Sequence, residues 1–382
     1  MLAAVFLLVI FFKRVTIKRA IVIINVMYMA KTAAFRKRTR RDLETTGLKH
    51  PLVLWQETQS LLKDIEKKMG GPVLAYFTAH DSKIHDDDVK YFYSHLKKIG
   101  HVKKIFFILI SHGGSGESAW RIASLVHNFC DKLVVILPEA AASAATIFSL
   151  SADQIIMTPL SFLTAVDTSI YHPLNPKDRD NQPVYVELDE VNRSVNALLQ
   201  KTASTTDDLH QIYKTVFDYI HPVAYGAIAR STTLSEMLCS DSMDLRTDKL
   251  DPQVKRKIIE HLNNNYPSHS YPIPRHKAKE LNLPIEYSDG ELDGLLSSFL
   301  NKYVHISKTA RSYLSDTVVH TEVVNTIIES VGQRFFLQHM KERRFDSNMK
   351  DWLTFKDEIR WLAVTGSKRG DKEKIHQTLL EC

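Results

Sequence analysis

Apolar and polar positions alternate in blocks between residues 50 and 160, and the period of each block indicates its structure. Four blocks have the periodicity of amphipathic helices: 56–70, 86–100, 116–130 and 141–152. Four continuous apolar runs between them are typical of buried strands: 72–79, 103–111, 132–139 and 153–159. Strands of this kind, separated by helices, form largely parallel sheets that are covered on both faces. The sequence therefore predicts an α/β fold.

The pattern changes after residue 290, where long amphipathic stretches follow one another. Residues 289–304, 321–344 and 348–364 each predict a helix, and a polar tail follows them. We therefore expect a helical extension over residues 291–382 that contacts other subunits or covers a site. The main domain is expected to span residues 46–290, after a basic arm at residues 1–45.

The arm carries the basic character of the chain, because the first 50 residues hold 11 of the 50 lysines and arginines but 2 of the 44 acidic residues. Lys13 and Arg14 interrupt its apolar start before it reaches the about 20 residues that a membrane-spanning helix needs. No signal-peptide cleavage site follows. We interpret residues 1–28 as an over-extended start of translation, with a short membrane-associating segment as the alternative. Residues 1–41 are expected to touch a membrane surface weakly.

Composition excludes several classes of function. The 382 residues contain three widely spaced cysteines, Cys130, Cys239 and Cys382, which predict neither a disulfide framework nor a zinc site. The chain lacks a recognisable nucleic-acid module and a dinucleotide-binding fingerprint. We therefore expect an intracellular, cytoplasmic protein without a metal, a cofactor or a specific nucleic-acid partner.

Two strand-to-helix turns carry the candidate chemistry, and the first is SHGGSGES at residues 111–118. Gly113, Gly114 and Gly116 permit a sharp turn and close approach of a substrate, and the following helix begins with amides that are free to bind an anion. The turn has neither the Walker A nor the GxGxxG spacing. We expect His112 in this turn to be structural, because nothing fixes a partner for it.

The second turn places Ser143 in a run of alanines directly after an apolar strand. If both turns lie side by side across a parallel sheet, the amides of Gly114 and Ala144 converge near the Ser143 hydroxyl. Paired donors of this kind form an oxyanion site, and each contributes roughly 3 kcal/mol of transition-state stabilisation. An alanine-rich core helix without chemistry is the alternative interpretation.

The stretch HGGSGESAWRIASLV followed by VVILPEAAASAATIFSLSADQIIM resembles the serine dehydrogenase proteinase family, relatives of the Clp-type proteases and signal peptide peptidases. Residues 264–287 are similar to a later segment of the same family. The resemblance implies a crotonase-like fold of stacked ββα units, with Ser143 as nucleophile and with Gly114 and Ala144 as oxyanion donors. It also implies a peptide or protein substrate and a homo-oligomer.

A serine hydroxyl is a poor nucleophile until a base takes its proton. The signal peptide peptidase branch uses a lysine downstream of the serine, and Lys201 follows Ser143 by 58 residues. The apolar helical run before Lys201 would bury its stem and so lower its pKa. We therefore predict a Ser143–Lys201 dyad. The alternative base is His172, whose sequence context resembles that of the base in Clp-type proteases.

One segment departs from the family pattern: LTAVDTS, residues 163–169, keeps Asp167 but lacks a glycine and two prolines. Asp167 and Asp189 are both candidates for a supporting carboxylate if the base is a histidine. Glu139 and Asp153 match family positions, but a helix-start charge and a cap explain them. Serine peptidase is the leading hypothesis. The alternatives are a crotonase-type enzyme acting on a small acyl substrate and a catalytically silent scaffold.

Overall fold

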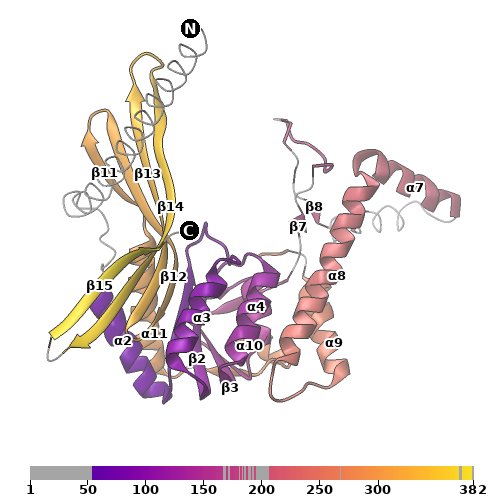
Figure 1. Cartoon of the computed structure of the whole chain (residues 1–382). Coiled ribbons are helices and arrows are strands. Elements are labelled where there is room, and N and C mark those ends of the chain that lie inside the picture. Colours follow the sequence, from indigo (N-terminus) through magenta and orange to yellow (C-terminus); the bar gives the residue numbers. More distant parts are fainter. Residues whose placement is uncertain are drawn as a thin grey trace, which may run out of the picture. The chain divides into compact units, whose positions relative to one another are not determined.

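The computed structural model describes residues 54–380 apart from gaps at 167–168, 171–172, 180, 183, 185, 188–190, 192, 195–205, 267 and 370–371. The described residues fall into two compact units (Figure 1). The larger unit contains residues 54–308, 323–339 and the chain from 358 onward. The smaller unit contains residues 309–322 and 340–357.

The larger unit is built on a mixed β-sheet with the strand order β10-β5-β3-β2-β1-β12-β13-β14-β15. Its parallel part consists of β1 (Val73–Thr78), β2 (Val102–Ile110), β3 (Cys130–Leu137), β5 (Gln154–Met157) and β10 (Ile285–Tyr287). Its remaining strands are β12 (Val318–Ser330), β13 (Gln333–Asp346), β14 (Asp351–Arg369) and β15 (Lys372–Leu380). β12 runs antiparallel to β1, so the sheet is not parallel throughout.

Helices pack around this sheet. They are α2 (Trp55–Met69), α3 (Asp88–Ile99), α4 (Gly116–His127), α5 (Ala144–Leu150), α8 (Pro222–Asp244), α9 (Pro252–Glu260), α10 (Arg275–Glu280) and α11 (Gly290–Ser307). α2 packs against α11, and α8 packs against both α4 and α5. All six residues of β1 are buried, which is the burial expected of a parallel strand in the middle of a sheet.

The predicted order of strands and helices between residues 56 and 160 is confirmed, and each boundary lies within three residues of its predicted position. Gly70 and Gly100 explain the sharp ends of α2 and α3. Both have positive φ, 75° and 76°, a conformation that glycine adopts without a steric cost. The ends of α2 and α3 could therefore be predicted from the glycine that follows each helix in the sequence.

The predicted helical extension is wrong in its second and third elements. Residues 289–304 do form a helix, α11, but residues 321–344 and 348–364 lie in the strands β12, β13 and β14. The buried positions of β12 alternate from His320 to Thr326, which is the period of a strand. Its valines, threonines and isoleucines are β-branched and favour this conformation.

A buried ion pair joins this antiparallel part of the sheet to α2 and α11. The Arg334 Nε donates to Glu329 Oε2 at 2.9 Å, and both side chains are almost fully buried. Thr58, Gln59 and Tyr303 also donate to the Glu329 carboxylate, at 2.7–2.8 Å. Removing one partner from such a network costs about 3–5 kcal/mol, because a charge is left buried without compensation. The network therefore fixes β12 against the two helices.

A separate three-stranded sheet shapes the region of Ser143. β4 (Ala140–Ala141) pairs in parallel with β6 (Phe162–Thr164), and β6 pairs antiparallel with β9 (Pro272–Pro274). Strands that are far apart in the sequence therefore meet directly beside the second strand-to-helix turn.

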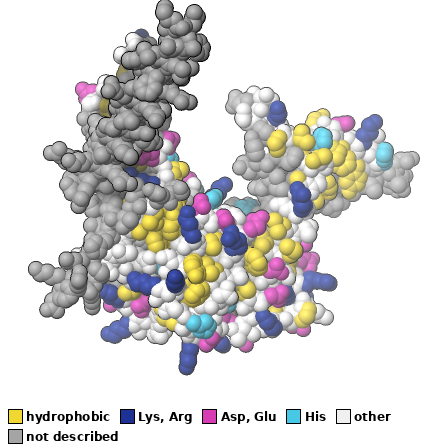
Figure 2. All heavy atoms as spheres, in the orientation of Figure 1, with side chains coloured by type: hydrophobic (Ala, Val, Ile, Leu, Met, Phe, Trp, Pro, Cys, Tyr) yellow, Lys and Arg dark blue, Asp and Glu magenta, His cyan; other side chains and the backbone are white. Residues whose placement is uncertain are grey.

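Apolar side chains are exposed on α7 (Thr206–Tyr219) and at the start of α8, where they gather on one surface (Figure 2). Tyr219 and Val223 are 77% and 58% exposed, and Tyr213 and Phe217 stack on each other. Exposed apolar side chains that gather on one surface are typical of contacts with another chain.

The smaller unit is a β structure. β11 (Ala310–Ser315) pairs antiparallel with the first part of β12, and the adjoining ends of β13 and β14 complete the unit. His320 and Glu322 are buried and contact each other at 3.2 Å. Within the described part of the chain, none of the helices combines the length and apolar character that crossing a membrane requires.

Candidate active site

A cavity of about 820 Å³ opens in the larger unit at the carboxyl ends of the parallel strands. Its wall comes from the loop after β1, the glycine turn after β2, the start of α5, the middle of α8 and a loop before β9. The residues that line it include His80, Asp81, Ser82, Lys83, Ile84, His85, His112, Gly113, Gly114, Ser115, Glu117, Ser143, Ala144, Val166, Ser231, Ser235 and His269. Open α/β sheets bind ligands at this end of their strands.

The structure brings the two strand-to-helix turns together at the floor of this cavity. The Ser111 amide donates to the Ala140 carbonyl at 3.0 Å, and the Ala142 amide donates to the Ser111 carbonyl at 2.9 Å. These two bonds form an isolated parallel bridge between Ser111 and Ala141. The glycine turn and Ser143 therefore lie directly beside each other.

Ser143 has a backbone conformation that is unusual for a serine. Its φ is 52° and its ψ is −112°, a strained region that costs about 1–3 kcal/mol for a residue with a side chain. Strained backbone of this kind persists where the surrounding structure determines it, and it is concentrated at functional sites. A sharp strand-to-helix turn also presents the serine hydroxyl of hydrolases that use a nucleophile elbow.

Two buried threonines hold the strained turn in place. The Ser143 amide donates to Thr164 Oγ1 at 2.9 Å, and Thr164 Oγ1 in turn donates to the Ala165 carbonyl at 3.0 Å. Thr146 Oγ1 donates to the carbonyls of Ala141 and Thr164 at 2.9 and 3.0 Å. The small sheet that contains β6 therefore supplies the bonds that offset the strain at Ser143.

Gly113 and Gly114 fit their positions because they lack a side chain. Their φ values are 110° and 144°. A Cβ on Gly113 would lie 3.0 Å from the Ser143 Cβ, and a Cβ on Gly114 would lie 2.3 Å from the Ile84 nitrogen. The Ile84 amide donates to the Gly113 carbonyl at 2.8 Å, and its carbonyl accepts from Ser115 at 3.0 Å. The loop after β1 therefore seals the glycine turn from one side.

The amides of Gly114 and Ala144 are among those in these turns that have no acceptor in the described part of the chain. The Gly113 amide, in contrast, donates to Ser111 Oγ at 3.1 Å. Gly114 is exposed to the cavity, and Ala144 is the first residue of α5. Amides at a helix start that are not used by the protein favour a negatively charged oxygen. This arrangement has the components of an oxyanion site beside the Ser143 hydroxyl.

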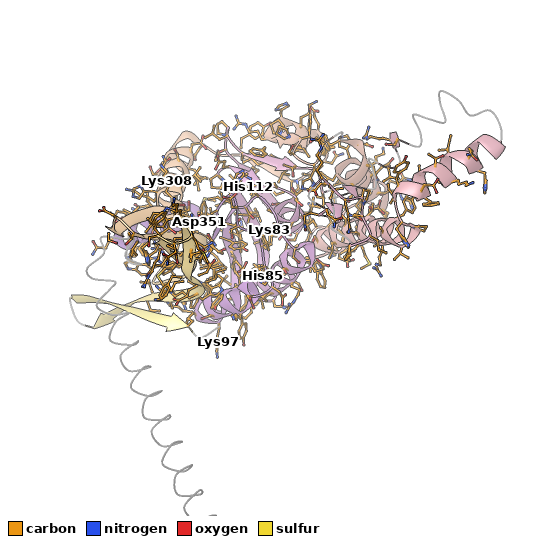
Figure 3. The ribbon with its side chains drawn as sticks, turned by 90° about the horizontal axis from the view of Figure 1, so that it is seen from above. Lys83, His85, Lys97, His112, Lys308 and Asp351 are labelled. Carbon is orange, nitrogen blue, oxygen red and sulfur yellow. The ribbon has the colours of Figure 1, made fainter. Side chains whose placement is uncertain are left out.

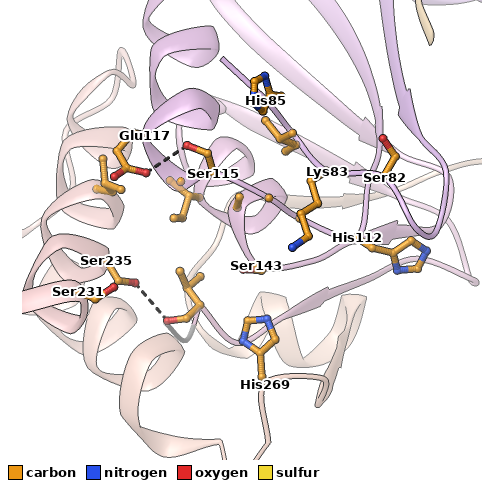
Figure 4. A pocket seen from close by; sticks show the side chains of 18 of the residues that line it. Ser82, Lys83, His85, His112, Ser115, Glu117, Ser143, Ser231, Ser235 and His269 are labelled. Atoms are coloured by element: carbon orange, nitrogen blue, oxygen red, sulfur yellow. Dashed lines mark hydrogen bonds between the residues drawn. The ribbon is translucent and has the colours of Figure 1, made fainter. Parts of the chain in front are cut away.

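Side chains with titratable groups surround this floor, and most of them were not predicted from the sequence. Seen from above, Lys83, His85 and His112 lie over the sheet of the larger unit (Figure 3). The Lys83 amine extends toward Ser143, whereas the His112 ring points away from it (Figure 4). Lys83 is exposed, and no described residue forms a hydrogen bond or an ion pair with it.

His112 faces another histidine at the rim of the cavity. Its ring centroid lies 4.7 Å from that of His80. Burial lowers the pKa of His112, the neighbouring His80 lowers it further, and Glu139 opposes the shift. These surroundings favour the neutral form of the His112 ring. They do not test the prediction that His112 is structural.

A buried carboxyl anchors the loop that carries Lys83 and His85. The Tyr76 hydroxyl and the His85 amide both donate to Asp88 Oδ2. Burial raises the pKa of Asp88 to about 6, and the bonds from Tyr76 and His85 oppose this rise. The bonds to Asp88 hold the loop after β1 over the glycine turn.

His269 completes the cavity from the loop before β9. It is half-buried, and its Nδ1 is buried without a hydrogen-bond partner. Its ring points toward Ser143 in the view of Figure 4, and both residues line the cavity. No local signal in the sequence marks this histidine, because it reaches the cavity only through the pairing of β9 with β6.

The predicted base and its supporting carboxylates lie outside the described residues. These are Lys201, His172, Asp167 and Asp189. Ser143, Gly113, Gly114 and Ala144 are brought together as described above. Asp153 accepts bonds from the amides of Leu133 in β3 and Thr247 after α8, at 2.8 and 2.7 Å. It therefore joins these two segments, and the prediction that it caps a helix is wrong.

Comparisons with known proteins add little to this geometry. No family model matches the chain, and a search of curated proteins gives no match. Among solved structures, the chain is similar to the ClpP protease catalytic domain from Plasmodium falciparum, with 12% sequence identity and a TM-score of 0.30. The match covers 61% of this chain and 92% of that chain. The resemblance to the serine dehydrogenase proteinase family remains a prediction from the sequence.

No group of three or more histidine, cysteine, aspartate or glutamate side chains in the described residues is arranged to hold a metal ion.

Proposed function

We propose that this protein is a serine hydrolase that cleaves peptide bonds, with Ser143 as the nucleophile and the Gly114 and Ala144 amides as the oxyanion site. The observation that carries the proposal is the strained backbone of Ser143 at the floor of a cavity, next to two amides without an acceptor. A core helix without chemistry begins with unpaired amides too, but it does not need the strained backbone.

The chemistry follows from these positions. A base takes the proton of the Ser143 hydroxyl while its oxygen attacks the scissile carbonyl carbon. The carbonyl oxygen becomes negatively charged, and the Gly114 and Ala144 amides donate hydrogen bonds to it. The amine then leaves with a proton, and water releases the acyl group from Ser143. Lys201 as the base, with His172 as the alternative, remains a prediction from the sequence.

Two other functions fit the geometry less well. A crotonase-type enzyme would use the same pair of amides for a thioester or enolate oxygen, and a silent scaffold would use neither. Neither function requires the strained Ser143 turn. Cysteine chemistry is disfavoured for Cys130 and Cys239, because burial raises the pKa of both thiols to about 12 and an effective nucleophile is a thiolate.

We also propose that the protein assembles with copies of itself. The exposed apolar side chains of α7 and the start of α8 support this, since they include Tyr219 and Val223. Burial of this surface between subunits would remove it from water, which is the main source of association free energy.

Hydrolysis of an unfolded protein tests the proposed function. The full-length chain is expected to release peptides from casein, and Ser143→Ala is expected to lower the rate by about a thousandfold or more. A short-chain acyl thioester is the comparison substrate. Thioester turnover that survives Ser143→Ala, without casein cleavage, would replace the hydrolase proposal with the crotonase-type alternative.

A further inference from the structure

His269 and Ser143 are positioned by the same small sheet. β6 supplies Thr164, which accepts the hydrogen bond from the Ser143 amide at 2.9 Å. β6 also pairs with β9, and His269 lies three residues before β9. The register Leu163↔Ile273 fixes the start of β9 relative to the serine turn. The small sheet therefore links His269 to Ser143 by a short path through β9 and β6, although the two residues are far apart in the sequence.

The surroundings of the His269 ring differ from those of a structural histidine. Its Nδ1 is buried, yet no hydrogen bond reaches this atom. Buried polar atoms are nearly always paired, because leaving one unpaired costs about 1–3 kcal/mol. His95, which is a structural histidine, makes bonds from both ring nitrogens, to Ser330 Oγ and to the Ile328 carbonyl. An unpaired ring in a cavity therefore indicates a role toward a substrate or a reacting group.

We propose that His269 is the general base that activates Ser143; this inference rests on the proposed function. His269 is half-buried and lines the same cavity as Ser143, and its ring points toward Ser143 in Figure 4. A neutral imidazole accepts a proton near neutral pH. His269 thereby takes the role that the sequence analysis gave to Lys201 or His172.

Other described side chains of the cavity are less suited to this role. An amine accepts a proton near neutral pH only when it is desolvated, and Lys83 is exposed. The His112 ring points away from Ser143 and faces His80. Charged and titratable side chains that line the cavity with His269 are His80, Asp81, Lys83, His85, His112 and Glu117.

The protons lost by Ser143 and His269 in this mechanism are all recovered by the end of the catalytic cycle. An unprotonated ring nitrogen of His269 takes the proton of the Ser143 hydroxyl while Oγ bonds to the carbonyl carbon. When the carbon–nitrogen bond of the substrate breaks, the imidazolium gives the proton to the leaving amine. Water then repeats the sequence, losing a proton to His269 and forming the carboxylic acid, and Ser143 regains its hydrogen.

The rate of labelling by a fluorophosphonate tests this inference on the full-length chain. His269→Ala is expected to lower the rate of labelling at Ser143 by about a hundredfold or more. His276→Ala is the matched control, because His276 is exposed on α10 and does not line the cavity; its labelling rate is expected to stay within about twofold of the original protein. Thermal unfolding of each variant shows whether it folds.

A further readout separates a base from a structural side chain. Free imidazole added to His269→Ala is expected to restore part of the labelling rate, because it occupies the space of the missing ring.

The outcomes are distinguishable from failure of the proposed function. Absence of any label in the unaltered protein would contradict the proposed serine hydrolase function itself. Label at Ser143 with an unchanged rate in a folded His269→Ala protein would overturn only the assignment of His269. Loss of labelling in Lys201→Ala, with His269→Ala unaffected, would return the role of base to Lys201.

Discussion

Replacing Ser143 by glycine is expected to abolish peptide hydrolysis while increasing the stability of the protein. Loss of the nucleophile from an interdependent site lowers turnover by about a thousandfold or more. The positive φ of 52° is strained for serine but not for glycine. The relief of strain exceeds the cost of a more flexible unfolded chain, so we expect a gain of about 1 kcal/mol in the free energy of unfolding.

Ser143→Ala is the matched control for this gain. Alanine removes the same hydroxyl but retains a Cβ, so it keeps the strain at this position. Urea unfolding of the two variants should therefore place the glycine variant about 1 kcal/mol above the alanine variant. Equal stabilities would show that the turn at Ser143 is not strained. The backbone of Ser143 would then no longer support its assignment as the nucleophile.

Replacing Gly114 by alanine is expected to have the second largest effect on activity. The new Cβ would lie 2.3 Å from the Ile84 nitrogen and 2.5 Å from the Ile84 oxygen. These are backbone atoms, and the φ of 144° at this position is itself unfavourable for alanine. The turn must therefore move, and the amide of residue 114 moves with it. Loss of one oxyanion donor lowers turnover by about a hundredfold to a thousandfold.

Gly226→Ala is the control for this substitution. Gly226 lies within α8, and no atom is within 4 Å of a Cβ at that position. Alanine there is expected to leave peptide hydrolysis unchanged and to raise the stability slightly, because alanine favours helix interiors. A Gly114→Ala protein with full turnover would show that this amide does not bind the oxyanion.

The sequence predicted the parallel part of the fold well because each element there has its own local sequence pattern. Strands β1, β2 and β3 contain unbroken apolar runs, and glycines end the helices α2 and α3. The strands β12, β13 and β14 were misread as helices, and β15 lies in the stretch that was expected to be a polar tail without a fold. The exposed ends of these strands carry many charged residues, which suit a helix equally well, and alternating burial covers only parts of β12 and β13.

The candidate site was predictable to the extent that it depends on neighbouring strands. The turns at Gly114 and Ser143 follow the parallel strands β2 and β3, which pair with each other, so their proximity follows from the order of elements. His269 reaches the same cavity only because β9 pairs with β6. That pairing joins segments about a hundred residues apart, and no local pattern in the sequence reveals it.

Fluorophosphonate labelling followed by peptide mass mapping tests whether Ser143 is the nucleophile. One covalent adduct is expected on the full-length protein, located at Ser143, and no adduct is expected on the Ser143→Gly variant. Ser82, Ser115, Ser231 and Ser235 line the same cavity and serve as internal controls. An adduct on any of these serines, or an unchanged mass after prolonged labelling, would contradict the assignment of Ser143 as the nucleophile.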